Sequence, residues 1–161
     1  MSTGFAPIAR EDARILILGS LPGQKSLQEF EYYAHPQNAF WPIMRKLFCV
    51  EGGYGQRCEQ LVGHGIAVWD VLARAVRPGS MDARIQRGTE AVNDFDKFLA
   101  EHPDIDLVCF NGQRAAQLFR GMVSPGYSRA LPRFETLPST SPAYAAMSFA
   151  DKLSRWRSTI G

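Results

Sequence analysis

The chain has 161 residues, of which 45% are hydrophobic and 21% are charged, and its formal net charge is +2. A chain of this size can bury about 70% of its unfolded surface, and its ordinary composition argues against wholesale disorder. The small excess of basic residues permits binding to nucleic acid but does not argue for it. We therefore expect one folded domain that spans residues 1–161.

The basic residues gather toward the second half of the chain. This distribution allows a local basic face, although scattered arginines most often form an ordinary solvated surface. The residues concerned are Arg74, Arg77, Arg84, Arg87, Arg114, Arg120, Arg129, Arg133, Lys152, Arg155 and Arg157.

The cysteines Cys49, Cys58 and Cys109 are widely spaced and include no C-x-x-C pair. A zinc knuckle or an iron–sulfur cluster therefore has no ligand set, and the three histidines add no metal-ligand spacing. Cys109 lies in an apolar run, where we expect a buried free thiol. The amino terminus has no signal pattern, and no apolar run approaches the ~20 residues that span a bilayer. These features predict a reducing, cytoplasmic setting.

The first predicted strand covers residues 15–19, after a short lead-in over residues 1–14. Its four consecutive aliphatic residues are typical of a strand buried on both faces in a parallel sheet. The strand ends in Gly-Ser-Leu-Pro-Gly at residues 19–23, where two glycines allow a close approach to a ligand and Pro22 fixes the chain between them. In open α/β sheets ligands bind beyond the carboxyl ends of strands, which is where this loop falls.

The next segment is crowded with aromatic residues and contains one histidine and one asparagine, an unusual content for a connector. We expect a loop of the active-site type over residues 27–33. From Phe40 onward the apolar residues recur with the spacing of an amphipathic helix, with Asn38 as its cap and Pro42 in its first turn. This helix is expected to end near residues 52–53.

The middle of the chain predicts a short helix over residues 56–62 and a second strand over residues 65–72. Residues 75–89 hold prolines, glycines and arginines without a clean period, so we expect a long connection, with one helical turn at most. Connections of this length in compact domains tend to be functional.

The rest of the chain again alternates helices and strands. Asn93 is expected to cap a helix that Pro103 closes, and residues 106–110 and 133–137 predict the third and fourth strands, with a helix over residues 113–120 between them. The last helix carries Phe149, Leu153, Trp156 and Ile160 on one face, with Ser148 and Asp151 in capping-box-like spacing. This order predicts an α/β fold, a three-layer α/β/α sandwich around a central four-stranded parallel sheet.

Three of the four predicted strands end in polar turns: Gly19-Ser20, Asn111-Gly112 and Ser139-Thr140-Ser141. Each alone would be read as an ordinary turn. Because the carboxyl ends of parallel strands lie at one edge of a sheet, their coincidence predicts a shared pocket.

Several residues near this edge have both a functional and a structural interpretation. His35 can act as an acid or base, but structural histidines are commoner and no nearby carboxylate clearly orients it. Asn38 can cap a helix, or its carboxamide can orient a water molecule. The aromatic residues Tyr32, Tyr33, Phe40 and Trp41 are core candidates, although one of them at the pocket can stack on a planar heterocycle. No dinucleotide-binding G-x-G-x-x-G and no serine-hydrolase G-x-S-x-G motif is present.

Three motifs resemble those of the uracil-DNA glycosylase superfamily. Gly-Ser-Leu-Pro-Gly at residues 19–23 is similar to its first motif, and Tyr-Ala-His-Pro-Gln-Asn-Ala-Phe-Trp at residues 33–41 resembles the A-H-P-x-N-x-F-W segment of its mismatch-specific branch. Leu-Pro-Ser-Thr-Ser at residues 137–141 resembles the last motif, a loop that grips the strand and enters the minor groove. The resemblance covers essentially the whole chain, and the motif at residues 33–41 is the most specific of the three. The resemblance implies that this chain has the fold of the superfamily.

One departure narrows the resemblance. Members that excise uracil place Asp or Asn where this chain has Ser20 and Leu21, neither of which can activate water in that way. The chain is therefore most similar to the hypoxanthine-DNA (deoxyinosine) glycosylase group, which shows the Gly-Ser-Leu-Pro-Gly form and assigns catalysis to the asparagine of its His-Pro-x-Asn segment. Carried over, that residue is Asn38. The absence of a cysteine cluster argues against the iron–sulfur branch.

The resemblance also implies roles for other residues. Tyr33 would stack on a flipped base and Asn111 would read its edge, with Ser20 and Leu21 completing the base pocket. The residues implied to contact DNA are Gly19, Pro22, Gly23, Lys25, Ser139, Thr140, Ser141 and, as a candidate wedge, Tyr144.

The implied activity is a DNA-repair hydrolysis that releases hypoxanthine and leaves an abasic site. The implied partner is DNA containing a deaminated base, and we expect a monomer that needs no metal and no organic cofactor. Two alternatives stay open: a mismatch-specific uracil or thymine glycosylase of the same fold, and a catalytically silent nucleic-acid-binding module.

Overall fold

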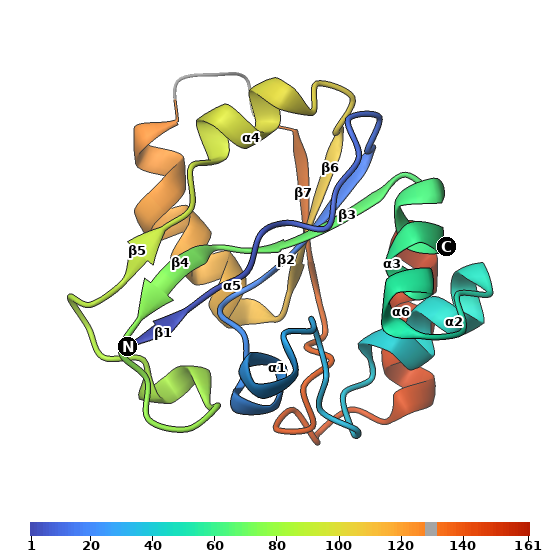
Figure 1. The fold of residues 1–161 in the computed structure, drawn as a ribbon, viewed down its shortest axis with the longest axis horizontal. Coiled ribbons are helices and arrows are strands. Elements are labelled where there is room, and N and C mark those ends of the chain that lie inside the picture. The colour runs from blue at the N-terminus through green and yellow to red at the C-terminus, as the bar shows by residue number, and fades with distance from the viewer. Residues whose placement is uncertain (128–131) are drawn as a thin grey trace.

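The centre of the molecule is a sheet of four parallel strands (Figure 1). In the computed structural model, which describes residues 1–127 and 132–161, the strands lie in the order β3-β2-β6-β7. They are β2 Ile15–Gly19, β3 Ile66–Asp70, β6 Leu107–Asn111 and β7 Arg133–Leu137. The predicted α/β class and its central parallel sheet are confirmed. Arg129, one of the basic residues noted in the sequence, lies outside the described residues.

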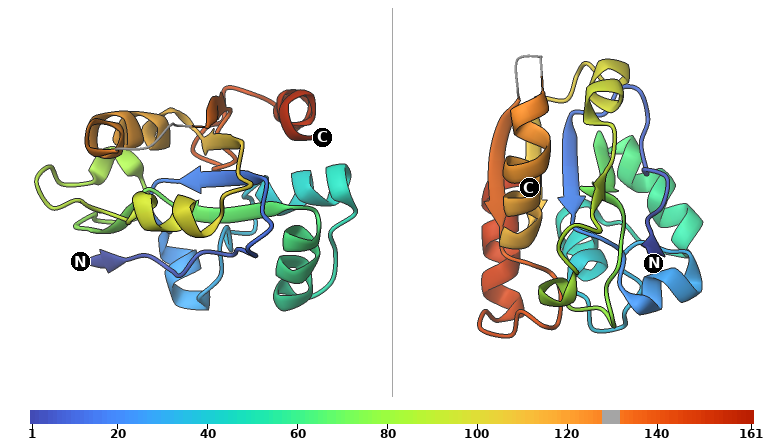
Figure 2. Two further views of the ribbon diagram at one scale, coloured as in Figure 1. Left: turned by 90° about the horizontal axis from the view of Figure 1, so that it is seen from above. Right: turned by 90° about the vertical axis from the view of Figure 1, so that its left-hand side faces the viewer.

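Side chains that alternate along β2 divide the core into two apolar clusters. Leu16 and Leu18 belong to one cluster and Ile17 to the other, because successive side chains of a strand point to opposite faces. The first cluster includes residues of α4 Phe95–Glu101 and α5 Gln113–Leu118, and the second includes residues of α2 Phe40–Phe48, α3 Tyr54–Gly63 and α6 Phe149–Ile160. Figures 1 and 2 show the two groups of helices on opposite sides of the strands, which makes the predicted three layers.

A second, small antiparallel sheet was not predicted. It consists of β1 Ser2–Thr3, β4 Leu72–Ala75 and β5 Ala91–Val92, in the order β1-β4-β5. The predicted strand over residues 65–72 is therefore two strands, since the chain leaves the main sheet after Asp70. Residues 71 and 72 are both buried, so the apolar run continues through the bend and periodicity cannot reveal it.

The segments that flank the first loop differ from prediction at their helix ends. A short helix, α1 Gln24–Glu29, lies after the first loop and overlaps the start of the loop that the sequence predicted over residues 27–33. Helix α2 is capped by Ala39 and ends at Phe48, where Cys49 takes a left-handed conformation with φ of 57°. The cap of α4 is Asp94, whose side chain accepts a bond from Lys97 N, whereas the Asn93 side chain donates to the backbone oxygen of Asp70.

The remaining elements are single turns and the last helix. The long connection contains one 3-10 turn, η1 Asp82–Arg84, and α5 continues into a π-helical turn, η2 Phe119–Val123, and a 3-10 turn, η3 Ser124–Gly126. Ser148 caps α6 as predicted, but Phe149 is exposed and Lys152 is buried. Within the described part of the chain, no helix is long and apolar enough to cross a membrane.

Candidate active site

The carboxyl ends of the parallel strands open into a pocket of about 720 Å³. Its walls come from the loop after β2, the segment before α2, the loop after β7 and the long connection after β4. All thirteen residues that the sequence singled out for catalysis, base binding or DNA binding line it, namely Gly19, Ser20, Leu21, Pro22, Gly23, Lys25, Tyr33, Asn38, Asn111, Ser139, Thr140, Ser141 and Tyr144. The shared pocket is therefore present, whereas the roles of its residues stay predictions.

The loop at residues 19–23 is held in place by a buried arginine. The Arg77 guanidinium donates from Nη1 to Leu21 O at 3.3 Å and from Nη2 to Pro22 O. It also pairs with Asp82 Oδ1 at 3.4 Å, so its buried charge is compensated by several acceptors. Arg77 belongs to the long connection, which closes over the loop. Sequence reasoning selected the connection as functional but did not single out this residue.

Tyr33 forms an aromatic wall of the pocket with an unusual backbone. Its φ of 57° lies in the left-handed region, which costs a residue other than glycine about 1–3 kcal/mol and persists only where the surroundings hold it. The Tyr33 ring stacks on buried Phe40, with ring centroids 4.2 Å apart and planes at 22°. On either side, Trp41 Nε1 donates to Tyr32 O at 2.8 Å and Ala34 N donates to Ser26 Oγ at 3.1 Å. The ring is thus fixed with Phe40 behind it.

Asn38 presents the nitrogen end of its carboxamide without a partner. Its Oδ1 accepts a bond from Phe40 N at 2.9 Å, a local turn that anchors the oxygen end. Among the described residues nothing is bonded to Nδ2. The neighbouring Ala39 N donates to Thr140 O at 2.9 Å, which joins this segment to the loop after β7. His35, by contrast, is exposed and accepts a bond from Gln37 N, which indicates a role in the turn.

The Asn111 carboxamide is oriented by Thr140. Its Nδ2 donates to Thr140 Oγ1 and its Oδ1 accepts from Thr140 N, both at 2.9 Å. One N–H of Nδ2 and one lone pair of Oδ1 remain for further partners. Gly112, with φ of 97°, allows the close contact of these loops, because a Cβ there would lie 3.0 Å from Ser139 Cβ. Thr140 therefore fixes the orientation of the Asn111 amide at the end of β6.

Asp70 is the pocket residue that sequence reasoning missed. It ends β3 beside Gly19, is only 4% exposed and lines the pocket. Neither its Oδ2 nor Tyr33 Oη has a hydrogen-bond partner among the described residues. A Cβ on Gly19 would lie 2.5 Å from Asp70 Oδ1 and 3.1 Å from Tyr33 Oη, so the missing side chain makes room for both groups. The available signal was a carboxylic acid at the end of an apolar run.

Burial governs the ionisation of these two groups. It raises the pKa of Asp70 to about 7, with Asp82 acting in the same direction and Arg77 in the opposite one. Burial and the Asp70 charge also raise the pKa of Tyr33, while the Asn111 side chain lowers it. Tyr33 therefore stays protonated, whereas Asp70 gains or loses its proton near neutral pH.

The loop after β7 is supported from α6. Trp156 Nε1 donates to Pro138 O at 3.0 Å, and buried Lys152 donates from Nζ to Ser141 O at 3.3 Å. Lys152 Nζ also lies 5.2 Å from the centre of the Tyr144 ring. Tyr144 itself is 38% exposed, so it is an outward-facing residue on a supported loop.

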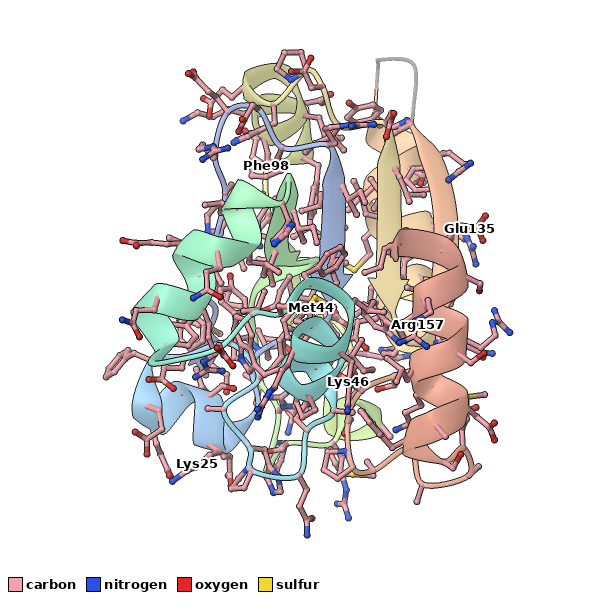
Figure 3. The ribbon with its side chains drawn as sticks, turned by 90° about the vertical axis from the view of Figure 1, so that its right-hand side faces the viewer. Lys25, Met44, Lys46, Phe98, Glu135 and Arg157 are labelled. Atoms are coloured by element: carbon pink, nitrogen blue, oxygen red, sulfur yellow. The ribbon has the colours of Figure 1, made fainter. Side chains whose placement is uncertain are left out.

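The basic residues do not all contribute to a surface. Arg77 and Lys152 are internal, and Lys25 forms an exposed pair with Glu29 at 3.0 Å, which contributes little to stability. In Figure 3, Lys25 projects outward from α1 at the end of the molecule opposite Phe98. Arg87 and Arg114 line a smaller hollow that shares Asp82 and Ala83 with the main pocket.

Comparison with known proteins shows the family to which the chain belongs. The family model of the uracil DNA glycosylase superfamily matches residues 6–160. A hypoxanthine DNA glycosylase from Methanosarcina acetivorans is 34% identical over 98% of this chain and 96% of its own length. A second one, from Methanosarcina barkeri, is 35% identical over 77% of this chain and 79% of its length. The solution structure of a candidate uracil DNA glycosylase from M. acetivorans has a TM-score of 0.79 at 32% identity, and the match covers 99% of this chain and 96% of that one.

The chain therefore belongs to the uracil DNA glycosylase superfamily. It is a DNA glycosylase, and both the fold and the enzyme class expected from the sequence motifs are confirmed.

The clamp on the 19–23 loop predicts that Arg77→Met is destabilising. The substitution leaves three carbonyl oxygens and Asp82 without their buried donor, and we expect a loss of roughly 2–4 kcal/mol in the free energy of unfolding. Urea unfolding measures the loss. The matched control is Arg84→Met, an exposed arginine of the same connection, which should change the value by less than about 0.5 kcal/mol. Equal effects of the two substitutions would contradict the clamp.

The buried carboxyl predicts a pH-dependent gain of stability in Asp70→Asn. An ordinary aspartate, with a pKa of 3.8, loses its proton at much lower pH than Asp70 does in the folded protein. Ionisation thus favours the unfolded chain increasingly from about pH 4 to 7, by ~4 kcal/mol at most. Urea unfolding should show the variant more stable than the wild type at pH 8, with the difference shrinking toward pH 4. A difference that is independent of pH would refute this account of the carboxyl.

Proposed function

We propose that the protein removes hypoxanthine from deoxyinosine in DNA by hydrolysing the N-glycosidic bond. The observation that carries the proposal is the pair of carboxamides in one pocket: Asn38 with a free nitrogen end and Asn111 fixed by Thr140. The loop at residues 19–23 has no side-chain carboxylate or amide that could replace Asn38. The names of the two Methanosarcina relatives support the choice of base.

DNA would be held through its backbone on both sides of the pocket. Residues 19–23 and 139–141 would bind phosphates through backbone N–H and hydroxyl groups, which gives position without sequence specificity. Tyr144, exposed on its supported loop, would fill the gap that the flipped nucleotide leaves. Flipping costs a few kcal/mol and least for a mispaired base, so a deaminated base is favoured at this step.

The base would then lie against Tyr33, whose other face rests on Phe40. Stacking on an aromatic ring contributes ~1–3 kcal/mol per base. The N–H and the lone pair that Thr140 leaves free on the Asn111 amide would bond to polar groups on the edge of hypoxanthine. Ser20 and Leu21, both buried, would bound the base on the side of the first loop.

Bond cleavage would proceed with oxocarbenium character in the sugar. Asn38 would hold the attacking water, and backbone amides would stabilise charge on the departing base. We favour a single hydrolysis step over a lyase step, which would need a free lysine amine in the pocket. Among the described residues Lys25 is the one lysine that lines the pocket, and it pairs with Glu29. We further propose a monomer that acts in a reducing cytoplasm, where its three free thiols persist.

A second candidate substrate is uracil or thymine in a mismatch. The candidate uracil DNA glycosylase among the solved structures favours it. The two alternatives differ in the base released and not in the machinery described above.

The role of Asn38 is tested by Asn38→Ala in single-turnover release of hypoxanthine from a deoxyinosine duplex. We expect a loss of roughly 100-fold or more in the rate, since one oriented polar group contributes about that much, with DNA affinity largely kept. The lost bond to Phe40 N should cost about 1 kcal/mol of stability, which thermal unfolding checks.

The matched control is Gln37→Ala, an exposed carboxamide in the same turn. It should release hypoxanthine at the wild-type rate. If Asn38→Ala also keeps that rate, the water-positioning role is wrong.

A further inference from the structure

We propose that the Asp70 carboxyl donates a proton to the departing purine, an inference that rests on the proposed hydrolysis of deoxyinosine. Asp70 lies in the pocket on the opposite side of β2 from Asn111, because β3 and β6 flank that strand. A base seated over Gly19 can therefore present one edge to Asn111 and another to Asp70.

The Asp70 carboxyl has no structural role in the hydrogen-bonding of the described residues. Within the described part of the chain, the side chain of Asp70 makes no hydrogen bond, whereas its backbone oxygen accepts from Asn93 Nδ2 at 2.8 Å. Its Oδ2 is buried without a partner. A buried carboxyl without a partner is unfavourable, and natural proteins retain such groups mainly where a ligand completes them. Since Asp70 lines the pocket, the acceptor that is missing here would come from the substrate.

Burial raises the pKa of Asp70, the neighbouring Asp82 carboxylate acts in the same direction, and Arg77 acts in the opposite one. Tyr32 and Tyr33 face Asp70 from the segment before α2, and Arg77 and Asp82 face it from the long connection. Arg77 is already shared among Asp82 and three backbone oxygens, so it compensates Asp70 only in part. The resulting pKa of about 7 is well matched to general acid catalysis near neutral pH.

The proposed step balances as follows. The C1′–N9 bond breaks and its electron pair moves into the purine ring. The Asp70 proton moves to an acceptor nitrogen of the purine, N3 or N7, so the base leaves neutral. The water held by Asn38 forms the C1′–O bond and loses its proton to solvent, and solvent then reprotonates the Asp70 carboxylate.

The test compares wild type with Asp70→Asn in single-turnover hypoxanthine release from pH 5.5 to 9, with DNA affinity measured in parallel. The wild-type rate should fall about tenfold per pH unit above roughly pH 7, as one proton is lost. The variant should be at least ~100-fold slower at pH 6, without this fall at high pH and with unchanged affinity. Asp104→Asn, at an exposed residue before the amino end of β6, should match the wild type.

A merely structural Asp70 would change stability without changing the shape of the pH profile. Wild-type rate and profile in Asp70→Asn would therefore overturn this proposal alone. No hypoxanthine release by the wild type at any pH would overturn the proposed function and this proposal together.

Discussion

The absence of a side chain at Gly19 is the constraint on which the polar wall of the pocket depends. A Cβ at this position would come within 2.5 Å of Asp70 Oδ1 and 3.1 Å of Tyr33 Oη, so another residue would displace both groups. Because β2 lies between β3 and β6, the same space also separates Asp70 from Asn111. Groups from three segments distant in sequence thus surround one point at the edge of the sheet, and the proposed base recognition and proton transfer both use it.

The loops around that point are held in fixed conformations by buried interactions, some of which lower the stability of the folded protein. Tyr33 keeps a left-handed backbone against Phe40. Arg77 donates two of its hydrogen bonds to the 19–23 loop, and Lys152 donates to the loop that carries Tyr144. A buried carboxyl without a partner is unfavourable as well. Such local costs are common where a protein must present polar groups to a ligand. The site is therefore organised before DNA binds.

The sequence predicts the framework of the site because strands and their terminal turns have local signals. The strand over residues 133–137 and the polar strand ends follow from composition and turn chemistry. Sequence reasoning did not find the roles of three residues, because each role depends on a partner that is distant in sequence. Arg77 donates to carbonyl oxygens 55 and 56 residues away, and Lys152 donates to Ser141. Asp70 is placed in the pocket by its neighbour in the sheet, Gly19. The bend after Asp70 was hidden because Val71 and Leu72 are apolar and buried, so the apolar run continues through it.

The central claim is that this pocket selects hypoxanthine and removes it by hydrolysis. The most direct measurement is single-turnover base release from duplexes that are identical except for one hypoxanthine, uracil or thymine. The account predicts that hypoxanthine is released fastest, leaving an intact strand with an abasic site. Release of uracil alone would contradict it, because the Asn38 and Asn111 pair would then serve a different base.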